Sequence, residues 1–535
     1  MIFTPLIIHP MHPILINGSF RASSATTLFT AFNPTTRTAI DGAYPVSSWS
    51  DIDAALDAAT SAFEAMLKLP RAVFAAFLEN YAAKIESNLE SLAKIAHEET
   101  GLPFLPRLRD VEGPRTVNQL RLAAAAARSG AWSEPVIDTK INLRACLGPI
   151  GPVVVLGPNN FPFAYNGIAG GDFAAAIAAG NPVIAKAHPS HPGTSLALAR
   201  LAQAAADETG LPKGAVQMLF HLSNEDGLRL MGDSRTAALG FTGSRTAGMA
   251  LKAACDGAGK TCYLEMSSVN PVVILPGALR ERGADIAKQY TDSCLLGAGQ
   301  FCTNPGIVFL VKSPEADAFL AKARETFEAA TPGTLLSEQT LKGLAAGVAA
   351  LQQAGAQVVC GGAPGDEGRY CFCNTLLTAT GAQFIANAHG LQTEAFGNAG
   401  LVVVCDSVEQ VEACLRQLEG NLTGCVYSDT TGKDDAAYVS AGHLLRQKVG
   451  RLINDKMPTG VAVSAAMNHG GPYPATGHPG FSAVGVPVSL KRFAMLQSFD
   501  SVREHRLPDV LRDSNPTVIQ RLVDGRWTDA KNGAP

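Results

Sequence analysis

The sequence predicts an α/β protein built from two doubly wound lobes, and three observations lead to this fold class. The chain has 535 residues, 47% hydrophobic and 17% charged, which is too long for one ordinary core and apolar enough for two or three domains. Short β-branched runs alternate with alanine-rich segments of helical spacing, as in parallel strands joined by crossover helices. The alternation begins again after Asn270-Pro271, where we place the boundary between the lobes.

Helices come first along the chain. Residues 51–56 have the form of a capped helix start. Apolar residues recur three and four positions apart over 71–97, which predicts one further helix. The alanine-rich stretch 120–128 predicts a third.

Strands and helices then alternate in the first lobe. Residues 151–158 are a continuous apolar run, typical of a strand that is buried on both faces. Further strands are expected at 181–186, 215–220 and 237–242, with helices at 172–180, 194–209 and 246–255. In the second lobe, which runs to about residue 480, strands are expected at 307–311 and 401–404. Residues 139–147 and the tail after Val484 fit neither lobe.

Composition narrows the possible partners and compartments. The formal net charge of −4 provides no basic field for nucleic acid or an anionic membrane, and no apolar stretch is long enough to span a bilayer. The opening residues 1–10 are apolar but lack a basic leader and contain prolines, so we expect no signal peptide and a cytoplasmic protein. The 11 cysteines are scattered, and neither they nor the histidines have metal-ligand spacing. We predict no metal.

Cys302 is the candidate nucleophile. It lies in Leu296-Gly297-Ala298-Gly299-Gln300-Phe301-Cys302-Thr303-Asn304-Pro305, where small neighbours let a substrate approach and leave backbone N–H donors available. The other cysteines are read as ordinary thiols of a reducing compartment.

Two more residues have suitable chemistry for the same site. Glu265, among apolar neighbours in Tyr263-Leu264-Glu265-Met266, is a candidate general base. Asn160 follows the first buried strand, where its amide can donate to an oxyanion; the alternative is an asparagine that only forms a turn before Phe161-Pro162.

A dinucleotide site is indicated without the usual GxGxxG turn, which the sequence lacks. At Phe241-Thr242-Gly243-Ser244 a strand turns into a helix, so backbone N–H groups and the Ser244 hydroxyl can bind a pyrophosphate; a capped helix without a ligand is the alternative. Lys186 ends a strand at the edge where such sheets bind ligands. The P-loop-like residues 254–261 follow a helix and precede a strand, the reverse of a true P-loop.

Together these segments resemble the aldehyde dehydrogenase superfamily over nearly the whole chain. The resemblance implies the aldehyde dehydrogenase fold, with a Rossmann-like cofactor lobe and a catalytic lobe. It also implies roles for individual residues: Cys302 as nucleophile, Glu265 as base, Asn160 in the oxyanion hole, and a set that binds NADP or NAD, namely Lys186, Gly243, Ser244, Glu394 and Phe396. Departures from the family pattern are Asn159, Pro189 and Asn398. Pro189 replaces an acidic residue that favours NAD, so NADP or dual use is favoured.

The resemblance also implies domain boundaries and a mechanism. Residues 1–138 and 158–270 would form the cofactor-binding domain and 271–483 the catalytic domain. A small β oligomerisation element, residues 139–157 and 484–535, would pair between subunits in a homodimer or homotetramer. Cys302 would attack the aldehyde, a thiohemiacetal would become a thioester, and Glu265 would activate the hydrolytic water.

The substrate is indicated by longer stretches. Residues 186–194, 469–476 and 507–527 are similar to the α-ketoglutaric semialdehyde (2,5-dioxovalerate) dehydrogenase branch. The implied reaction is oxidation of that aldehyde to 2-oxoglutarate. Phe163 and Phe301 are candidate walls of the aldehyde pocket, and a place in the core is the alternative for both. Another semialdehyde, an aliphatic aldehyde, an acylating enzyme that uses CoA or phosphate, and a binding protein that retains only the fold are the alternatives.

Overall fold

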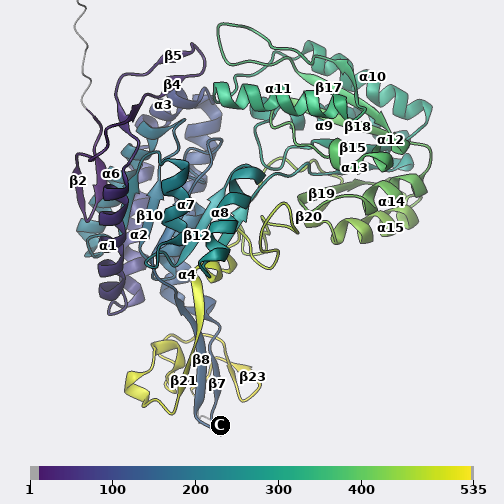
Figure 1. The fold of residues 1–535 in the computed structure, drawn as a ribbon. Coiled ribbons are helices and arrows are strands. Elements are labelled where there is room, and N and C mark those ends of the chain that lie inside the picture. Colours follow the sequence, from purple (N-terminus) through teal and green to yellow (C-terminus); the bar gives the residue numbers. More distant parts are fainter. Residues whose placement is uncertain (1–10, 532–535) are drawn as a thin grey trace, which may run out of the picture.

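We describe residues 11–531 in a computed structural model of the chain; the opening segment 1–10, on which the expectation about a signal peptide rests, lies outside them. Two seven-stranded sheets and one five-stranded sheet form the body of the molecule (Figure 1). Both large sheets are covered by helices, so the predicted α/β class with two lobes is confirmed. Within residues 11–531 no helix combines the length and apolar character needed to cross a membrane.

The first sheet contains five parallel strands with a short antiparallel pair at one edge. Its order is β13 (Thr261–Glu265), β12 (Ala238–Thr242), β9 (Val153–Leu156), β10 (Val183–Lys186), β11 (Val216–Leu219), β1 (Ile14–Ile16) and β2 (Ser19–Arg21). The chain adds β10 and β11 on one side of β9 and then β12 and β13 on the other side. The order of the strands therefore reverses between β9 and β12, and sheets of this kind bind ligands at such a point.

Eight helices accompany this sheet: α1 (Trp49–Met66), α2 (Arg71–Ser87), α3 (Leu89–Thr100), α4 (Gly113–Ser129), α5 (Gly171–Ala178), α6 (Pro192–Thr209), α7 (Asn224–Gly232) and α8 (Arg245–Gly257). A π-helical segment, Phe104–Glu112, precedes α4. Short strand pairs, β3 (Leu28–Phe29) with β6 (Tyr44–Pro45) and β4 (Phe32–Asn33) with β5 (Thr38–Ala39), connect β2 to α1.

Three helix boundaries differ from the sequence prediction. The single helix expected over 71–97 is two helices that break at Asn88, whose side-chain amide donates to the Lys84 carbonyl at 2.8 Å and so competes with the helical ladder. The helix expected from residue 120 begins at Gly113, because Pro114 occupies the first turn, where proline is tolerated. Ser48, rather than Asp51, is the N-cap of α1, and Asp51 completes its capping box.

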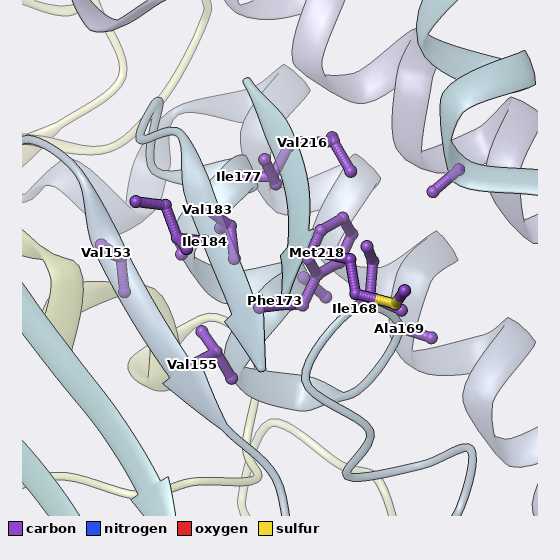
Figure 2. Packing of buried hydrophobic residues seen from close by; sticks show 14 of the residues in the cluster. Val153, Val155, Ile168, Ala169, Phe173, Ile177, Val183, Ile184, Val216 and Met218 are labelled. Atoms are coloured by element: carbon purple, nitrogen blue, oxygen red, sulfur yellow. The ribbon is translucent and has the colours of Figure 1, made fainter. Parts of the chain in front are cut away.

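Part of the core of the first lobe lies between the parallel strands and α5. Val153 and Val155 of β9 and Val183 of β10 are buried with Phe173 and Ile177 of α5 (Figure 2). Strands buried on both faces explain the continuous apolar runs in the sequence. This packing fixes the carboxyl ends of β9 and β10, which border the candidate site.

The second sheet has the order β16 (Gln357–Cys360), β17 (Thr375–Thr380), β18 (Ala399–Cys405), β15 (Ile307–Val311), β14 (Val272–Ile274), β19 (Asn421–Tyr427) and β20 (Val449–Asn454). Only its edge pair, β16 with β17, is antiparallel. Its helices are α9 (Pro276–Leu295), α10 (Pro314–Ala329), α11 (Glu338–Gln353), α12 (Gly381–Ala386), α13 (Ala388–Leu391), α14 (Val408–Arg416) and α15 (Asp435–Arg446).

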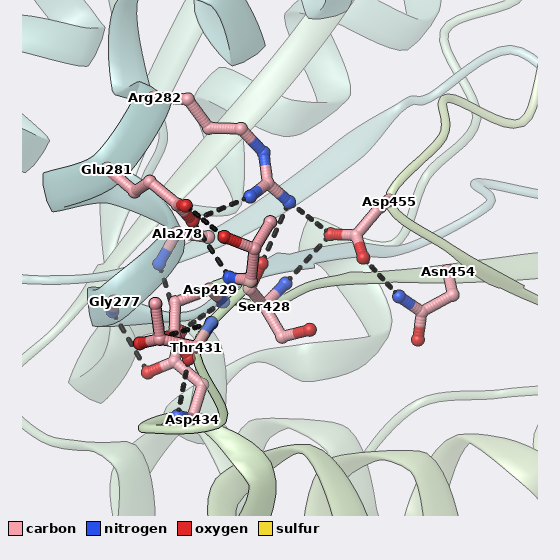
Figure 3. Close-up of polar contacts among 11 residues, drawn as sticks. Gly277, Ala278, Glu281, Arg282, Ser428, Asp429, Thr431, Asp434, Asn454 and Asp455 are labelled. Carbon is pink, nitrogen blue, oxygen red and sulfur yellow. Dashed lines mark hydrogen bonds and ion pairs between the residues drawn. The ribbon is translucent and has the colours of Figure 1, made fainter.

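A polar network anchors the start of α9 in this lobe (Figure 3). The buried Asp434 carboxylate accepts the backbone N–H groups of Gly277 and Ala278 at 2.9 Å each, which satisfies first-turn donors of the helix. Arg282 of the same helix pairs with Asp455 at the end of β20. The network fixes α9, whose far end leads directly into the Cys302 loop.

The small sheet projects from the two lobes, drawn in blue and yellow at the bottom of Figure 1. Its order is β21 (Ala494–Asp500), β8 (Leu143–Pro149), β7 (Val136–Asp138), β22 (Arg521–Val523) and β23 (Arg526–Thr528). The predicted boundaries of this element, 139–157, need correction. The sheet already includes β7, while β9 lies at the centre of the first sheet. The chain changes sheets after β8 ends at Pro149, where Gly151 has a φ of 128°.

Candidate active site

A cavity of about 940 Å³ lies between the two large sheets and is lined by residues from both lobes. Its volume is that of a site for a sizeable organic ligand. The structure brings together the residues predicted to bind cofactor or to react, since all of them line this cavity: Asn160, Lys186, Gly243, Ser244, Glu265, Cys302, Glu394 and Phe396. Lys186 and Glu265 are the last residues of β10 and β13.

The Cys302 loop adopts a backbone that its small residues permit. Gly297, Ala298 and Gly299 have φ values of 58°, 56° and 68°. A Cβ on Gly299 would lie 2.0 Å from the carbonyl oxygen of Gly397, so the Cys302 loop packs directly on the loop that carries Glu394. From the other side, the Asn270 amide donates to the Cys302 carbonyl at 2.9 Å. Both contacts fix the position of the sulfur.

Cys302, His469 and Glu265 form a contiguous cluster. The Cys302 Sγ lies 3.3 Å from His469 Nε2, and this nitrogen lies 2.9 Å from Glu265 Oε1. His469 is buried, and its backbone N–H donates to the Ser482 hydroxyl at 2.8 Å. The sequence does not identify His469 as a site residue, because it is 167 residues from Cys302 and no catalytic pattern surrounds it within the stretch 469–476.

The electrostatics of the cluster favour a protonated thiol before substrate binds. Burial, and then the negative charge of Glu265, raise the pKa of Cys302 well above its usual value. A nucleophile in this state needs a base in contact with it, and the His469 imidazole is at hydrogen-bonding distance. The second oxygen of Glu265, Oε2, is buried and has no hydrogen-bond partner among residues 11–531, so it can accept from a bound water.

Thiol, imidazole and carboxylate are also ligands of zinc, and the ligand atoms of these three residues lie within 4.8 Å of one another. The spacing of these residues in the sequence does not predict such a grouping. That the protein contains no metal stays a prediction.

Asn160 is held next to the nucleophile loop. Its side-chain amide donates to the Gln300 carbonyl at 3.0 Å, and the residue is buried. Gln300 is itself fixed, since its side chain donates to the Gly297 and Thr334 carbonyls. The Cys302 backbone N–H has no partner in the part of the chain that is described. An amide and a free N–H near one sulfur are the elements of an oxyanion hole.

The other end of the cavity carries the predicted cofactor residues. Burial lowers the pKa of Lys186 to about 8 and raises that of Glu394 to about 7. Ser244 is the N-cap of α8, and its hydroxyl accepts the Ala247 N–H at 3.3 Å. The Gly243 N–H donates to the Glu265 carbonyl at 3.0 Å, so donors for a pyrophosphate would be the N–H groups that follow it.

The aromatic wall of the cavity differs from the prediction. Phe161 and Tyr165 line it, whereas Phe163 is buried in the core of the first lobe. The chain turns tightly after Asn160, so side chains four residues apart share a face and Phe163 points away. Phe301 stands behind the wall, with its ring centroid 5.5 Å from that of Phe161 in an edge-on contact.

Comparison with known proteins is consistent across sequence and fold. The model of the aldehyde dehydrogenase family matches residues 20–461. The chain is 38% identical to α-ketoglutaric semialdehyde dehydrogenase 2 of Azospirillum brasilense, over 96% of this chain and 98% of that protein. It is 35% identical, with the same coverage, to α-ketoglutaric semialdehyde dehydrogenase of Acinetobacter baylyi. The NAD+ complex of an aldehyde dehydrogenase from Bacillus cereus shares the fold, with a TM-score of 0.79 at 22% identity over 92% of this chain and 96% of that chain.

Proposed function

The chain belongs to the aldehyde dehydrogenase family, and on this premise we propose that it oxidises 2,5-dioxovalerate (α-ketoglutaric semialdehyde) to 2-oxoglutarate with NADP+ or NAD+. The observation that carries the proposal is the contact of Cys302 with His469 and of His469 with Glu265. Cys302 and Glu265 line the same cavity as Lys186 and Glu394. Full-length similarity to two dehydrogenases named for this aldehyde supports the substrate.

We propose the following roles for the reacting residues. The Cys302 proton moves to His469 Nε2 as the sulfur adds to the aldehyde carbon. The N–H formed in this way donates to Glu265 Oε1, which stabilises the imidazolium. The Cys302 N–H and the Asn160 amide stabilise the oxyanion; removal of one such donor costs about 3–4 kcal/mol. Glu265 Oε2 then takes a proton from the water that releases the acid from the sulfur.

The cavity fits a nicotinamide cofactor. A half-buried carboxylate (Glu394), an aromatic ring (Phe396) and a lysine at a strand end (Lys186) line it together with the start of α8. Glu394 and Lys186 would hold ribose hydroxyls, and the first N–H groups of α8 would hold the pyrophosphate. When bound, the nicotinamide supplies the acceptor for the hydride that leaves the former aldehyde carbon.

NADP+ or dual use is proposed from the surroundings of Lys186. His188, Pro189 and Ser190 line the cavity beside it, and none of them is acidic. Burial, and then the charge of Lys186, lower the pKa of His188 well below its usual value, so Lys186 supplies the positive charge here. A 2′-phosphate would meet no carboxylate among these neighbours.

Assembly and location complete the proposal. We propose a homodimer or homotetramer that pairs through the small sheet, and a cytoplasmic location. The described cysteines are all free thiols, as expected in a reducing compartment.

The test is a steady-state comparison of both cofactors over 2,5-dioxovalerate, succinate semialdehyde, pentanal and octanal, without CoA or phosphate. We expect NAD(P)H and 2-oxoglutarate in equal amounts, with the highest kcat/KM for 2,5-dioxovalerate. A strict need for CoA or phosphate would instead indicate acyl transfer, and a preference for octanal would refute the substrate. Cys302→Ala should abolish turnover and retain cofactor binding.

A further inference from the structure

Arg115 of α4 lies beside the aromatic wall of the cavity. Its guanidinium carbon is 5.4 Å from the centroid of the Tyr165 ring and 5.8 Å from that of Phe161. Its Nε donates to the Gln119 side chain at 3.0 Å and one terminal nitrogen donates to the Tyr165 hydroxyl at 3.3 Å. Both partners are neutral, and the other terminal nitrogen has no partner within the described ranges.

Arg115 is also electrostatically connected to the nucleophile. Its positive charge opposes the rise in the pKa of Cys302, and it acts in the same direction on Tyr165. A half-buried arginine close enough to influence a reactive thiol is a candidate to bind an anionic ligand there.

The neighbouring arginines are already engaged. Arg107 pairs with the buried Glu112 carboxylate and also donates to the Asn160 carbonyl at 3.2 Å. Arg451 donates to the Pro458 carbonyl at 3.0 Å and to the Gly460 carbonyl, and so holds the loop that follows β20. Both terminal nitrogens of Arg107 and of Arg451 thus have partners, whereas one terminal nitrogen of Arg115 has none among residues 11–531.

We infer that Arg115 is the specificity-determining residue that binds the carboxylate of an aldehyde acid, an inference that rests on the proposed function. The guanidinium offers two parallel donors to a carboxylate. The aldehyde end of the same molecule then reaches Cys302, while its short carbon chain lies against Phe161 and Tyr165. An unsubstituted aliphatic aldehyde leaves the cation without a partner.

The experiment measures the ratio of kcat/KM for 2,5-dioxovalerate to that for pentanal in wild type, Arg115→Met, Arg115→Lys and Arg121→Met. Arg121 is a surface residue of the same helix that pairs with Glu86, so its variant controls for loss of a helix cation. We expect the ratio to fall about 100-fold in Arg115→Met, mostly through KM, and not in Arg121→Met. Arg115→Lys keeps the charge but loses the two-pronged contact, so its ratio should lie between the two.

A ratio that stays within threefold of wild type in both Arg115 variants would overturn the inference and leave the proposed function intact. If wild type does not favour 2,5-dioxovalerate over pentanal, the proposed function fails. Competitive inhibition by glutarate then tests whether Arg115 binds a carboxylate. If it does, glutarate inhibits wild type and this inhibition is lost in the Arg115 variants; inhibition that is equal in all of them overturns the inference. Should Arg115→Met not fold, Arg115→Lys provides both measurements.

Discussion

At the scale of single residues, the central observation is that a half-buried thiol with a raised pKa contacts an imidazole. A cysteine in this state is a poor nucleophile unless a neighbouring base accepts its proton. His469 provides that acceptor, and Glu265 contacts the same ring nitrogen. The buried carboxylate therefore has two tasks, one for each oxygen.

We predict that His469→Gln lowers kcat/KM roughly 10²–10⁴-fold, the usual contribution of a general base. Because the thiol then ionises without help, alkylation of Cys302 by iodoacetamide at pH 7 should also slow, and its pH profile should move to higher pH. His443→Gln, an exposed histidine on α15, is the matched control and should behave as wild type. Equal alkylation rates in both variants would contradict the role of His469.

Glu265→Gln should separate acylation from hydrolysis. The amide can still contact His469, but it cannot take a proton from water. In a rapid-mixing experiment we expect a burst of NAD(P)H close to one per site, followed by a steady rate that is roughly 10²–10⁴-fold lower than in wild type. Loss of the burst as well would show that Glu265 is needed before the thioester forms.

The candidate residues that could be predicted from sequence are those with a recognisable local pattern. Cys302, Glu265 and Asn160 each lie in a short segment whose neighbours indicate the chemistry. His469 and Arg115 have no such pattern; they meet Cys302 and Tyr165 only because loops and helices from distant parts of the chain converge. Phe163 is the reverse case: the sequence suggests a place in the cavity wall, but the side chain lies in the core. One tight turn decides which aromatic ring reaches the cavity.

At the scale of elements, the Cys302 loop depends on glycine at a close approach. Gly299→Ala adds a Cβ that would lie 2.0 Å from the Gly397 carbonyl oxygen, at a φ of 68°. We expect it to shift the Cys302 loop away from the Glu394 loop, which lowers Tm, kcat and cofactor affinity together. The matched control is Gly210→Ala, which has a φ of 72° but nothing within 4 Å. It should cost about 1–2 kcal/mol of stability and retain activity.

The end of β10 predicts a pH dependence of cofactor choice. Lys186 has a pKa lowered to about 8 by burial, so in the free protein it is charged below that pH and neutral above it. A 2′-phosphate favours the charged form, so the ratio of Kd for NAD+ to Kd for NADP+ should fall as pH rises from 7 to 9. Titration of Glu394 should change the Kd values of NAD+ and NADP+ by similar factors, so it largely cancels in their ratio. Lys186→Arg should hold the ratio constant by calorimetry; a flat wild-type ratio would refute the contact.

The element boundaries that the sequence predicts less well have local causes. Alternation of buried runs and alanine-rich stretches identifies the strands and helices of the first lobe, because parallel strands must be apolar on both faces. It does not reveal that Asn88 ends a helix through its own side chain, or that Pro114 belongs to a first turn. Such features depend on one side chain, whereas hydrophobic periodicity is read over a window of many residues and does not resolve them.

At the scale of the whole molecule, the two lobes enclose a cavity that the small sheet does not line. Its outer strand, β21, is seven residues long and has no neighbour on its outer side among the described strands. Met495 and Leu496 of this strand are exposed, as is Trp527 of β23. A long apolar edge strand of this kind is a site for pairing with another chain.

The last prediction concerns assembly through that edge. Leu496→Lys should shift sedimentation velocity from the dimer or tetramer toward the monomer, because a charge would then be buried without a partner at the interface. The control is Val439→Lys on α15, since the two side chains are similarly exposed, at 68% for Leu496 and 66% for Val439. The Val439 variant should sediment as wild type. If the Leu496 variant also does so at micromolar concentration, subunits do not pair through β21, and the exposed residues of the small sheet have another role.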